Sequence, residues 1–394
     1  MFYLIVYFIL LVLSLLNLQY SDRLSRQMLL PPVALLLIGI AGLRYETGGD
    51  WDTYTQLFES FPSFSRLVHH PEELAGLSVE EGFTLLCALV KSAGGNVQHL
   101  FFVVTSINIL LISSALPRYT RYPVIGLLCY YCILYFQLEM IYIRQATAVA
   151  LCFYALQYVQ DKKFFRFMFF ILLACTFHRV AAIMLPLYFV LDRRLPTWVY
   201  LAVIGGGALL MLEGVPWIRN IFLTIAGWLG EGYAEKAEFY TEHALFATSR
   251  RLSVGYFLNL ALLAVFLLFH REVVRRPYGT VMLNMFALSL ILYYYCFELV
   301  EVSNRMRMFF NIGIIVVLPM LLELLPAFMD RLMGLAVVAL YCFSFSQGIF
   351  LEAPQAAAYN PYQNYIEYKL HPRPSTGKQR LEQSKKAFRQ ERNR

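Results

Sequence analysis

Long apolar segments recur along the whole of this chain, and they leave few folds open to it. The runs at 1–18, 28–43, 100–116 and 332–351 each approach the ~20 apolar residues that cross a ~30 Å hydrocarbon layer. Inside lipid every backbone amide needs an internal partner, so segments of this length must be helices. The chain is 59% hydrophobic and only 15% charged, against roughly 25% charged in soluble domains. The sequence therefore predicts an all-α, polytopic integral membrane protein.

The apolar pattern predicts a series of spans followed by a polar tail. We expect spans near 2–19, 28–43, 99–116, 122–139, 141–159, 196–213, 253–269, 280–298, 308–325 and 332–351. With shorter segments, this gives about 11–13 transmembrane or re-entrant helices. The helical transmembrane domain is then 1–351, and 352–394 is a basic tail that we expect to be partly disordered.

The stretch 164–191 does not fit one ordinary span. Basic residues stand on both sides of it, at 162–166 and 193–194, so both flanks belong to the cytoplasmic face. The stretch must therefore enter the membrane and return. We predict two short helices with Phe177, His178 and Arg179 at the turn; a single tilted helix is the alternative.

Loop charges predict which segments lie outside. The remaining basic loops also mark the cytoplasmic side, which puts segments 44–98 and 214–252 on the outer face. The tail is ambiguous, because its Lys and Arg residues favour the inside while the count of crossings puts it outside. The first residues carry no basic n-region and no cleavage site, which favours a retained first helix over a signal peptide.

Ionisable residues near the hydrocarbon are costly, so each is a candidate for function. The topology puts ten of them near the outer face: Arg44, Asp50, Glu139, Arg144, His178, Arg179, Glu298, Glu301, Arg305 and Arg307. Arginine's planar fork matches phosphate oxygens, so several arginines around one outward-facing cavity suit a diphosphate. The alternative is that each arginine pairs with a nearby carboxylate, as the spacing of Glu139 with Arg144 and of Glu301 with Arg305 allows.

Other chemistry is predicted to be absent. His178 has a near-neutral pKa that suits proton transfer, although a lone histidine at a turn also serves as a hydrogen-bonding residue. No second histidine or carboxylate stands at ligand spacing from it, so we expect no metal site. The sequence contains no phosphate-loop or dinucleotide glycine motif. We therefore expect no nucleotide cofactor, and no nucleic acid among the partners.

Several short motifs, in order, resemble the EpsG family of Wzy-type polysaccharide polymerases. Residues 44–51 read R-Y-E-T-G-G-D-W, similar to an R-x(3,4)-G-x-D-[YW] signature, and residues 80–83 read E-E-G-F where E-P-G-F is usual. The resemblance continues through I-R-Q-A at 143–146, F-H-R at 177–179, N-R at 304–305 ahead of F-F at 309–310, and N-P-Y at 360–362. Two positions depart from the pattern: Glu81 replaces proline, and Arg179 stands where a small residue is commoner.

The resemblance implies a glycosyltransferase type C-like, metal-independent membrane enzyme. Such polymerases transfer a growing glycan from undecaprenyl diphosphate onto a lipid-linked repeat unit, at the outer side of the bacterial inner membrane. The implied partners are the undecaprenyl-diphosphate-linked oligosaccharide and the lipid bilayer, with chain-length regulator and flippase proteins as candidates. That implied side agrees with the loop charges.

With this reaction in view, each polar residue receives a candidate role. Arg144 and Arg305, helped by Arg44 or Arg307, are expected to bind the diphosphate. The acceptor hydroxyl must be oriented and deprotonated, for which the candidates are Asp50, Glu80 and His178. Stacking on sugar rings is assigned to Tyr54, Tyr142 and Tyr362; an interfacial aromatic belt is the alternative for these tyrosines.

Competing functions stay open at this point. A flippase-type transporter of a lipid-linked sugar would carry inverted repeats with broken helices, and the sequence shows none. An O-antigen ligase or an acyltransferase is the nearer enzymatic alternative. A purely structural membrane subunit would leave the arginines unexplained.

Overall fold

The computed structural model describes the chain except for residues 21–27, 71–78, 215–216, 243–253, 373 and 393–394. The described residues form helices and no strand, apart from one isolated β-bridge between Arg44 and Asn364. Two compact units result: Met1–Leu185 with Leu318–Arg394, and Pro186–Val317. The predicted all-α fold is confirmed.

Apolar helices of two lengths support a membrane protein. Among the described residues, α1 (Phe2–Gln19), α8 (Val97–Tyr119), the continuous helix Pro123–Met140 and α22 (Phe328–Phe350) are long and apolar enough to cross a membrane. The pair α20 (Val300–Asn311) and α21 (Ile314–Leu324), bent by 47°, adds a fifth candidate. Shorter apolar helices are α3 (Leu30–Gly42), α13 (Phe164–Phe177), η3 (Arg179–Phe189), α14 (Thr197–Glu213), α17 (Val254–Leu268) and α19 (Gly279–Tyr295).

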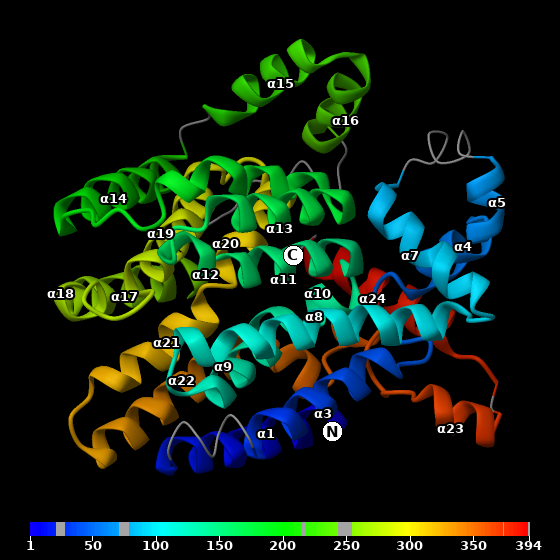
Figure 1. Ribbon diagram of the computed structural model, residues 1–394, viewed down its shortest axis with the longest axis horizontal. Helices are drawn as coiled ribbons and strands as arrows, with labels where there is room; N and C mark the ends of the chain where they lie inside the picture. The colour runs from blue at the N-terminus through cyan, green and yellow to red at the C-terminus, as the bar shows by residue number, and fades with distance from the viewer. Residues whose placement is uncertain (21–27, 71–78, 215–216, 243–253, 373, 393–394) are drawn as a thin grey trace. The chain divides into compact units, whose positions relative to one another are not determined.

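The first unit is built around a helix whose hydrogen-bonding pattern changes midway. Proline at its first position starts α9 (Pro123–Tyr130), which continues through the π-helical turn η2 (Tyr131–Tyr135) into α10 (Phe136–Met140). This helix packs on α1, α3 and α22 (Figure 1). Its buried tyrosines are satisfied by backbone: Tyr131 donates to the Tyr3 carbonyl at 2.9 Å and Tyr135 to the Leu37 carbonyl at 2.5 Å. These bonds fix the register of the neighbouring helices.

A second layer of the first unit carries the polar residues of interest. The helix α11 (Ile143–Ala155), continued by α12 (Gln157–Gln160), packs between α8 and α13, while α3 packs on α8. The segment after α3 forms α4 (Trp51–Ser60), α5 (Phe64–His69) and α7 (Glu81–Ser92). Aromatic side chains of α4 and α7 share one core with α8.

The predicted turn at residues 177–179 is confirmed, and the single tilted helix is wrong. Helix α13 ends at Phe177, and the 3-10 helix η3 begins at Arg179. Between them His178 is extended, with φ −159° and ψ 113°. The turn therefore lifts the His178 side chain out of the helical repeat.

The second unit is a smaller helical bundle. Helix α19 packs on α14 and α20, and α15 (Ile218–Leu229) packs on α16 (Glu231–Glu242); α18 (His270–Val273) follows α17. The buried Asn284 amide connects α19 to α14 and to the segment before it. Its oxygen accepts from the Tyr200 hydroxyl at 2.5 Å, and its nitrogen donates to the Leu191 carbonyl at 2.8 Å. Glu298 accepts from the backbone amides of Trp217 and Ile218, which caps α15.

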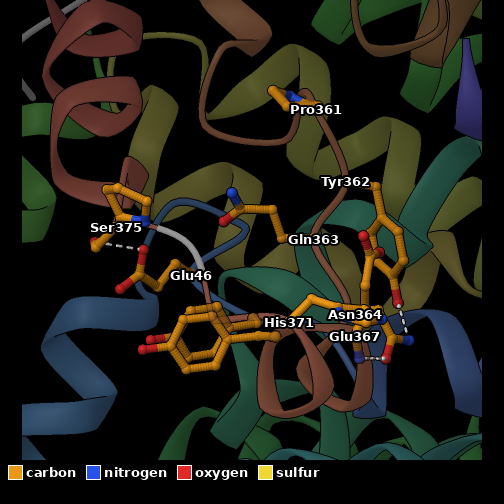
Figure 2. Close-up of a pocket in the computed structure, with 11 residues that line it drawn as sticks. Glu46, Pro361, Tyr362, Gln363, Asn364, Glu367, His371 and Ser375 are labelled. Atoms are coloured by element: carbon orange, nitrogen blue, oxygen red, sulfur yellow. Dashed lines mark hydrogen bonds between the residues drawn. The ribbon is translucent and has the colours of Figure 1, made fainter.

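The tail contains η4 (Pro354–Ala356), α23 (Tyr365–Leu370) and α24 (Gly377–Arg392). It lies on the loop that follows α3: Tyr45 donates to the Gln363 carbonyl at 2.8 Å, and Tyr365 to the Leu43 carbonyl at 2.7 Å. Figure 2 shows Glu46 of that loop bonded to Ser375 of the tail. The tail and the loop after α3 are therefore in direct contact. Disorder within the tail and the division of the chain at 351 stay predictions.

Candidate functional site

Three polar residues from distant parts of the sequence meet in the first unit. The Glu80 carboxylate accepts a hydrogen bond from Arg144 Nη1 at 2.7 Å and lies 3.1 Å from His178 Nδ1. Glu80 is the residue before α7, Arg144 is in the first turn of α11, and His178 is at the break after α13. Their side chains are 12%, 32% and 15% exposed. We call these residues the Glu80 cluster; it is partly buried.

A glycine allows the cluster to form. A Cβ at Gly82 would lie 2.3 Å from Thr176 Oγ1 and 2.9 Å from the Thr176 carbonyl oxygen. The first turn of α7 and the last turn of α13 thus approach too closely for any other residue. This contact brings Glu80 and His178, two residues away on either side, within hydrogen-bonding distance.

Replacing Gly82 by alanine should therefore separate α7 from α13. We expect a loss of about 1–3 kcal/mol of stability, typical of an overpacked contact, together with reduced activity because Glu80 moves away from His178. Thermal unfolding of the purified protein measures the first effect. The matched control is Gly39→Ala in α3, where a Cβ would meet nothing within 4 Å and where alanine favours the helix by up to about 1 kcal/mol. Equal unfolding temperatures for both variants would contradict this account.

The cluster keeps the Glu80 carboxylate charged. Burial alone would raise the pKa of Glu80, but the hydrogen bond with His178 and the positive charge of Arg144 outweigh it and lower the pKa from 4.5 to about 2. The carboxylate is therefore ionised at neutral pH and is a weak base.

This pKa makes a prediction for stability against pH. A carboxyl whose pKa is lower in the folded state stabilises the fold above its unfolded value, and this contribution disappears as the pH falls from about 4.5 to about 2. The shift corresponds to on the order of 3 kcal/mol. We expect the unfolding temperature of Glu80→Gln to be lower than that of the wild type at neutral pH, with the difference shrinking in this acidic window. A difference that is constant between pH 5 and pH 2 would contradict the prediction.

Tyr54 of α4 completes the surroundings of Arg144. Its hydroxyl is hydrogen bonded to Arg144, and its ring packs edge-on against Phe83, with the ring centres 6.0 Å apart. Only 7% of Tyr54 is exposed. This placement favours orienting Arg144 over stacking on a sugar ring.

The carboxylate nearest to Arg144 in sequence is not its partner. Helix α10 ends at Met140 and α11 begins at Ile143, so Glu139 and Arg144 do not share a helical face. Glu139 is fully buried and accepts from the Tyr130 hydroxyl at 2.6 Å and the Asn108 amide at 3.0 Å. The spacing interpretation was wrong for this pair. It is confirmed for Glu301 and Arg305, whose Oε1 and Nε atoms are 2.8 Å apart.

The other predicted diphosphate ligands have contacts of their own. Arg44 is 1% exposed; it donates to the Ala41 and Glu139 carbonyls and lies 4.2 Å from the ring centre of Phe101. In the second unit, Arg307 donates to the Ser289 carbonyl at 3.0 Å, with its guanidinium 4.6 Å from the Tyr293 ring centre. Joint binding of one diphosphate by Arg144, Arg305, Arg44 and Arg307 stays a prediction.

The remaining predicted residues line cavities or lie close to them. Asp50, the residue before α4, borders a cavity of about 860 Å³. Tyr142, the residue before α11, is half-buried and stands two residues before Arg144. Tyr362 lines a smaller pocket of about 140 Å³, shown in Figure 2, and its ring stacks on Phe2 with the centres 4.3 Å apart. One face of the Tyr362 ring is therefore covered by Phe2 and cannot stack on a sugar.

Sequence reasoning missed the neutral residues of the large cavity. Gln137 and Gln347 stand in apolar helices and line it. An uncharged amide in an otherwise apolar run was the available signal, since a buried amide needs partners. Within the described ranges, no three His, Cys, Asp or Glu side chains gather where they could hold a metal ion, and metal independence stays a prediction.

Comparison with known proteins gives one result. The model of a protein family described as the EpsG family matches residues 27–370, which include all three residues of the Glu80 cluster. No curated protein and no solved structure matches the chain significantly.

Proposed function

This chain belongs to the EpsG family of Wzy-type polysaccharide polymerases, and from that membership we propose the reaction that it catalyses. It transfers a growing glycan from undecaprenyl diphosphate onto a lipid-linked repeat unit, at the outer side of the bacterial inner membrane. The single observation that supports this proposal most is the contact of Arg144 and His178 with one ionised carboxylate, Glu80.

In this reaction a glycosidic bond forms and the anomeric carbon–oxygen bond to the diphosphate breaks. The electron pair of the broken bond passes to the lipid diphosphate, whose negative charge increases. Arg144 suits this charge, because a guanidinium has five N–H donors and one Nη1 bond to Glu80 leaves others for phosphate oxygens. Charge stabilisation of this kind is often the largest contribution to catalysis.

The acceptor hydroxyl must lose its proton as the new bond forms. Glu80, with a pKa of about 2, is a poor base near neutral pH. His178 is the better candidate, and the Glu80 carboxylate beside Nδ1 would orient the ring and stabilise the imidazolium that forms. Glu80 is thus proposed as a positioning residue, and Asp50, at the cavity, as a residue that orients the acceptor.

The proposal is tested with purified protein in liposomes containing one lipid-linked repeat unit. A ladder of longer lipid-linked glycans is the expected product. Transfer of a finished glycan to a different lipid, with no ladder, would indicate a ligase. Movement of unchanged lipid-linked sugar across the bilayer would indicate a transporter, and either result would overturn the polymerase assignment.

A further inference from the structure

One cavity of the first unit lies between two apolar helices and the C-terminal tail. Its volume of about 860 Å³ falls in the range of sites that bind small organic ligands. Helices α10 and α22 form one side, and the tail helix α24 contributes Leu381, Ser384 and Lys385. These three residues are at helical spacing, so they lie on one face of α24.

The lining suits a neutral, hydroxyl-rich ligand. The amides of Gln137, Gln347 and Gln355 border the cavity, and each amide can both donate and accept hydrogen bonds. The lining contains one carboxylate, Asp50, and one cation, Lys385, so its charges cancel. A diphosphate site would concentrate cations instead. Amides together with the aromatic rings of the lining suit a carbohydrate.

The tail helix is held firmly enough to serve as a wall. The Arg380 guanidinium donates to the Glu46 carbonyl at 2.7 Å, the Gln363 side chain at 2.8 Å and the Pro361 carbonyl at 2.9 Å. The Glu46 carboxylate accepts from the Gly377 amide, at the start of α24, at 3.1 Å. Ser384 donates to the Gln355 carbonyl, and both residues line the cavity.

The cavity also adjoins the Glu80 cluster along the chain. Asp50, on its border, stands one helical turn before Tyr54, which is hydrogen bonded to Arg144. Ile141, another lining residue, precedes Arg144 by three residues. Two lining residues are thus close in sequence to residues that surround the arginine.

We propose that this cavity binds the oligosaccharide part of a substrate, and that α24 forms its wall. The inference rests on the proposed function, since it places the sugar next to the bond that reacts. The ligand class is a neutral or weakly charged oligosaccharide without its lipid and diphosphate.

The test uses the full chain in nanodiscs and the free oligosaccharide released by mild acid from the lipid-linked repeat unit. This probe has neither lipid nor diphosphate and cannot react. Calorimetric titration should show binding that is weakened at least tenfold in Gln137→Ala/Gln347→Ala, while the exposed Gln56→Ala control binds like the wild type.

A second variant tests the wall. A Cβ at Gly377 would lie 2.6 Å from the Cβ of Glu46 and 2.7 Å from the Trp51 ring, so Gly377→Val should displace the start of α24 and also weaken binding at least tenfold. Wild-type affinity in both the double variant and Gly377→Val overturns the inference. Wild-type affinity in Gly377→Val alone overturns the role of the tail.

The two proposals fail in different ways. A wild-type protein that binds the oligosaccharide but builds no ladder contradicts the proposed function. A wild-type protein that builds ladders, with unchanged affinity in the cavity variants, contradicts only the inference about the cavity.

Discussion

Replacing Arg144 by alanine is expected to abolish the ladder of lipid-linked glycans. The change removes the donors proposed for the diphosphate, and loss of one such donor typically lowers the rate about 10²–10³-fold. It also leaves Glu80 without the cation at 2.7 Å. The measurement is the rate of ladder growth in liposomes, with unfolding temperature recorded alongside it.

Two companion variants sharpen this experiment. Arg144→Lys keeps the charge but loses the planar fork, so we expect it to recover only part of the rate. Arg179→Ala is the matched control: Arg179 is 69% exposed and lies 3.4 Å from the exposed Glu81, an arrangement that contributes little to stability. Equal rates for Arg144→Ala and Arg179→Ala would refute the role of Arg144.

His178→Ala should lower the rate of each transfer about 10²–10⁴-fold, the range for loss of a general base. Binding of the lipid-linked substrate should change little, so the effect belongs in kcat rather than KM. The control is His69→Ala, at the exposed end of α5, which should retain wild-type kinetics.

The pH profile distinguishes a catalytic histidine from a merely structural one. If His178 is the base, only its neutral form accepts the proton, so the wild-type rate should rise with pH. In Glu80→Gln the carboxylate 3.1 Å from His178 Nδ1 is lost, so the rate should depend on pH differently from the wild-type rate. Profiles that coincide for the wild type and Glu80→Gln would argue that the pair only maintains the fold.

The helices and the turn at His178 could be predicted because they depend on local patterns. Apolar runs define spans, and the basic residues on both sides of 164–191 require that stretch to return. The structure accordingly breaks the helix at His178. The spacing of four residues also predicted the ion pair between Glu301 and Arg305, because both lie on one continuous helix.

The partner of Arg144 could not be predicted in this way. Glu80 precedes it by 64 residues, and their meeting depends on the packing of α7 against α13 at Gly82. The nearer carboxylate, Glu139, is separated from Arg144 by a helix end that no proline or glycine marks in residues 139–144. The lining of the large cavity is likewise assembled by tertiary contacts.

The docking of the tail also bears on how the topology of such proteins is inferred. Counting basic residues assumes that each cation responds to the membrane field, yet Arg380 is 6% exposed and both of its Nη atoms donate to protein oxygens. A cation enclosed in this way has already exchanged water for fixed protein partners. It therefore says little about which side of the membrane the tail occupies. A reporter joined to the C-terminus would consequently mark the compartment that contains the loop between α3 and α4.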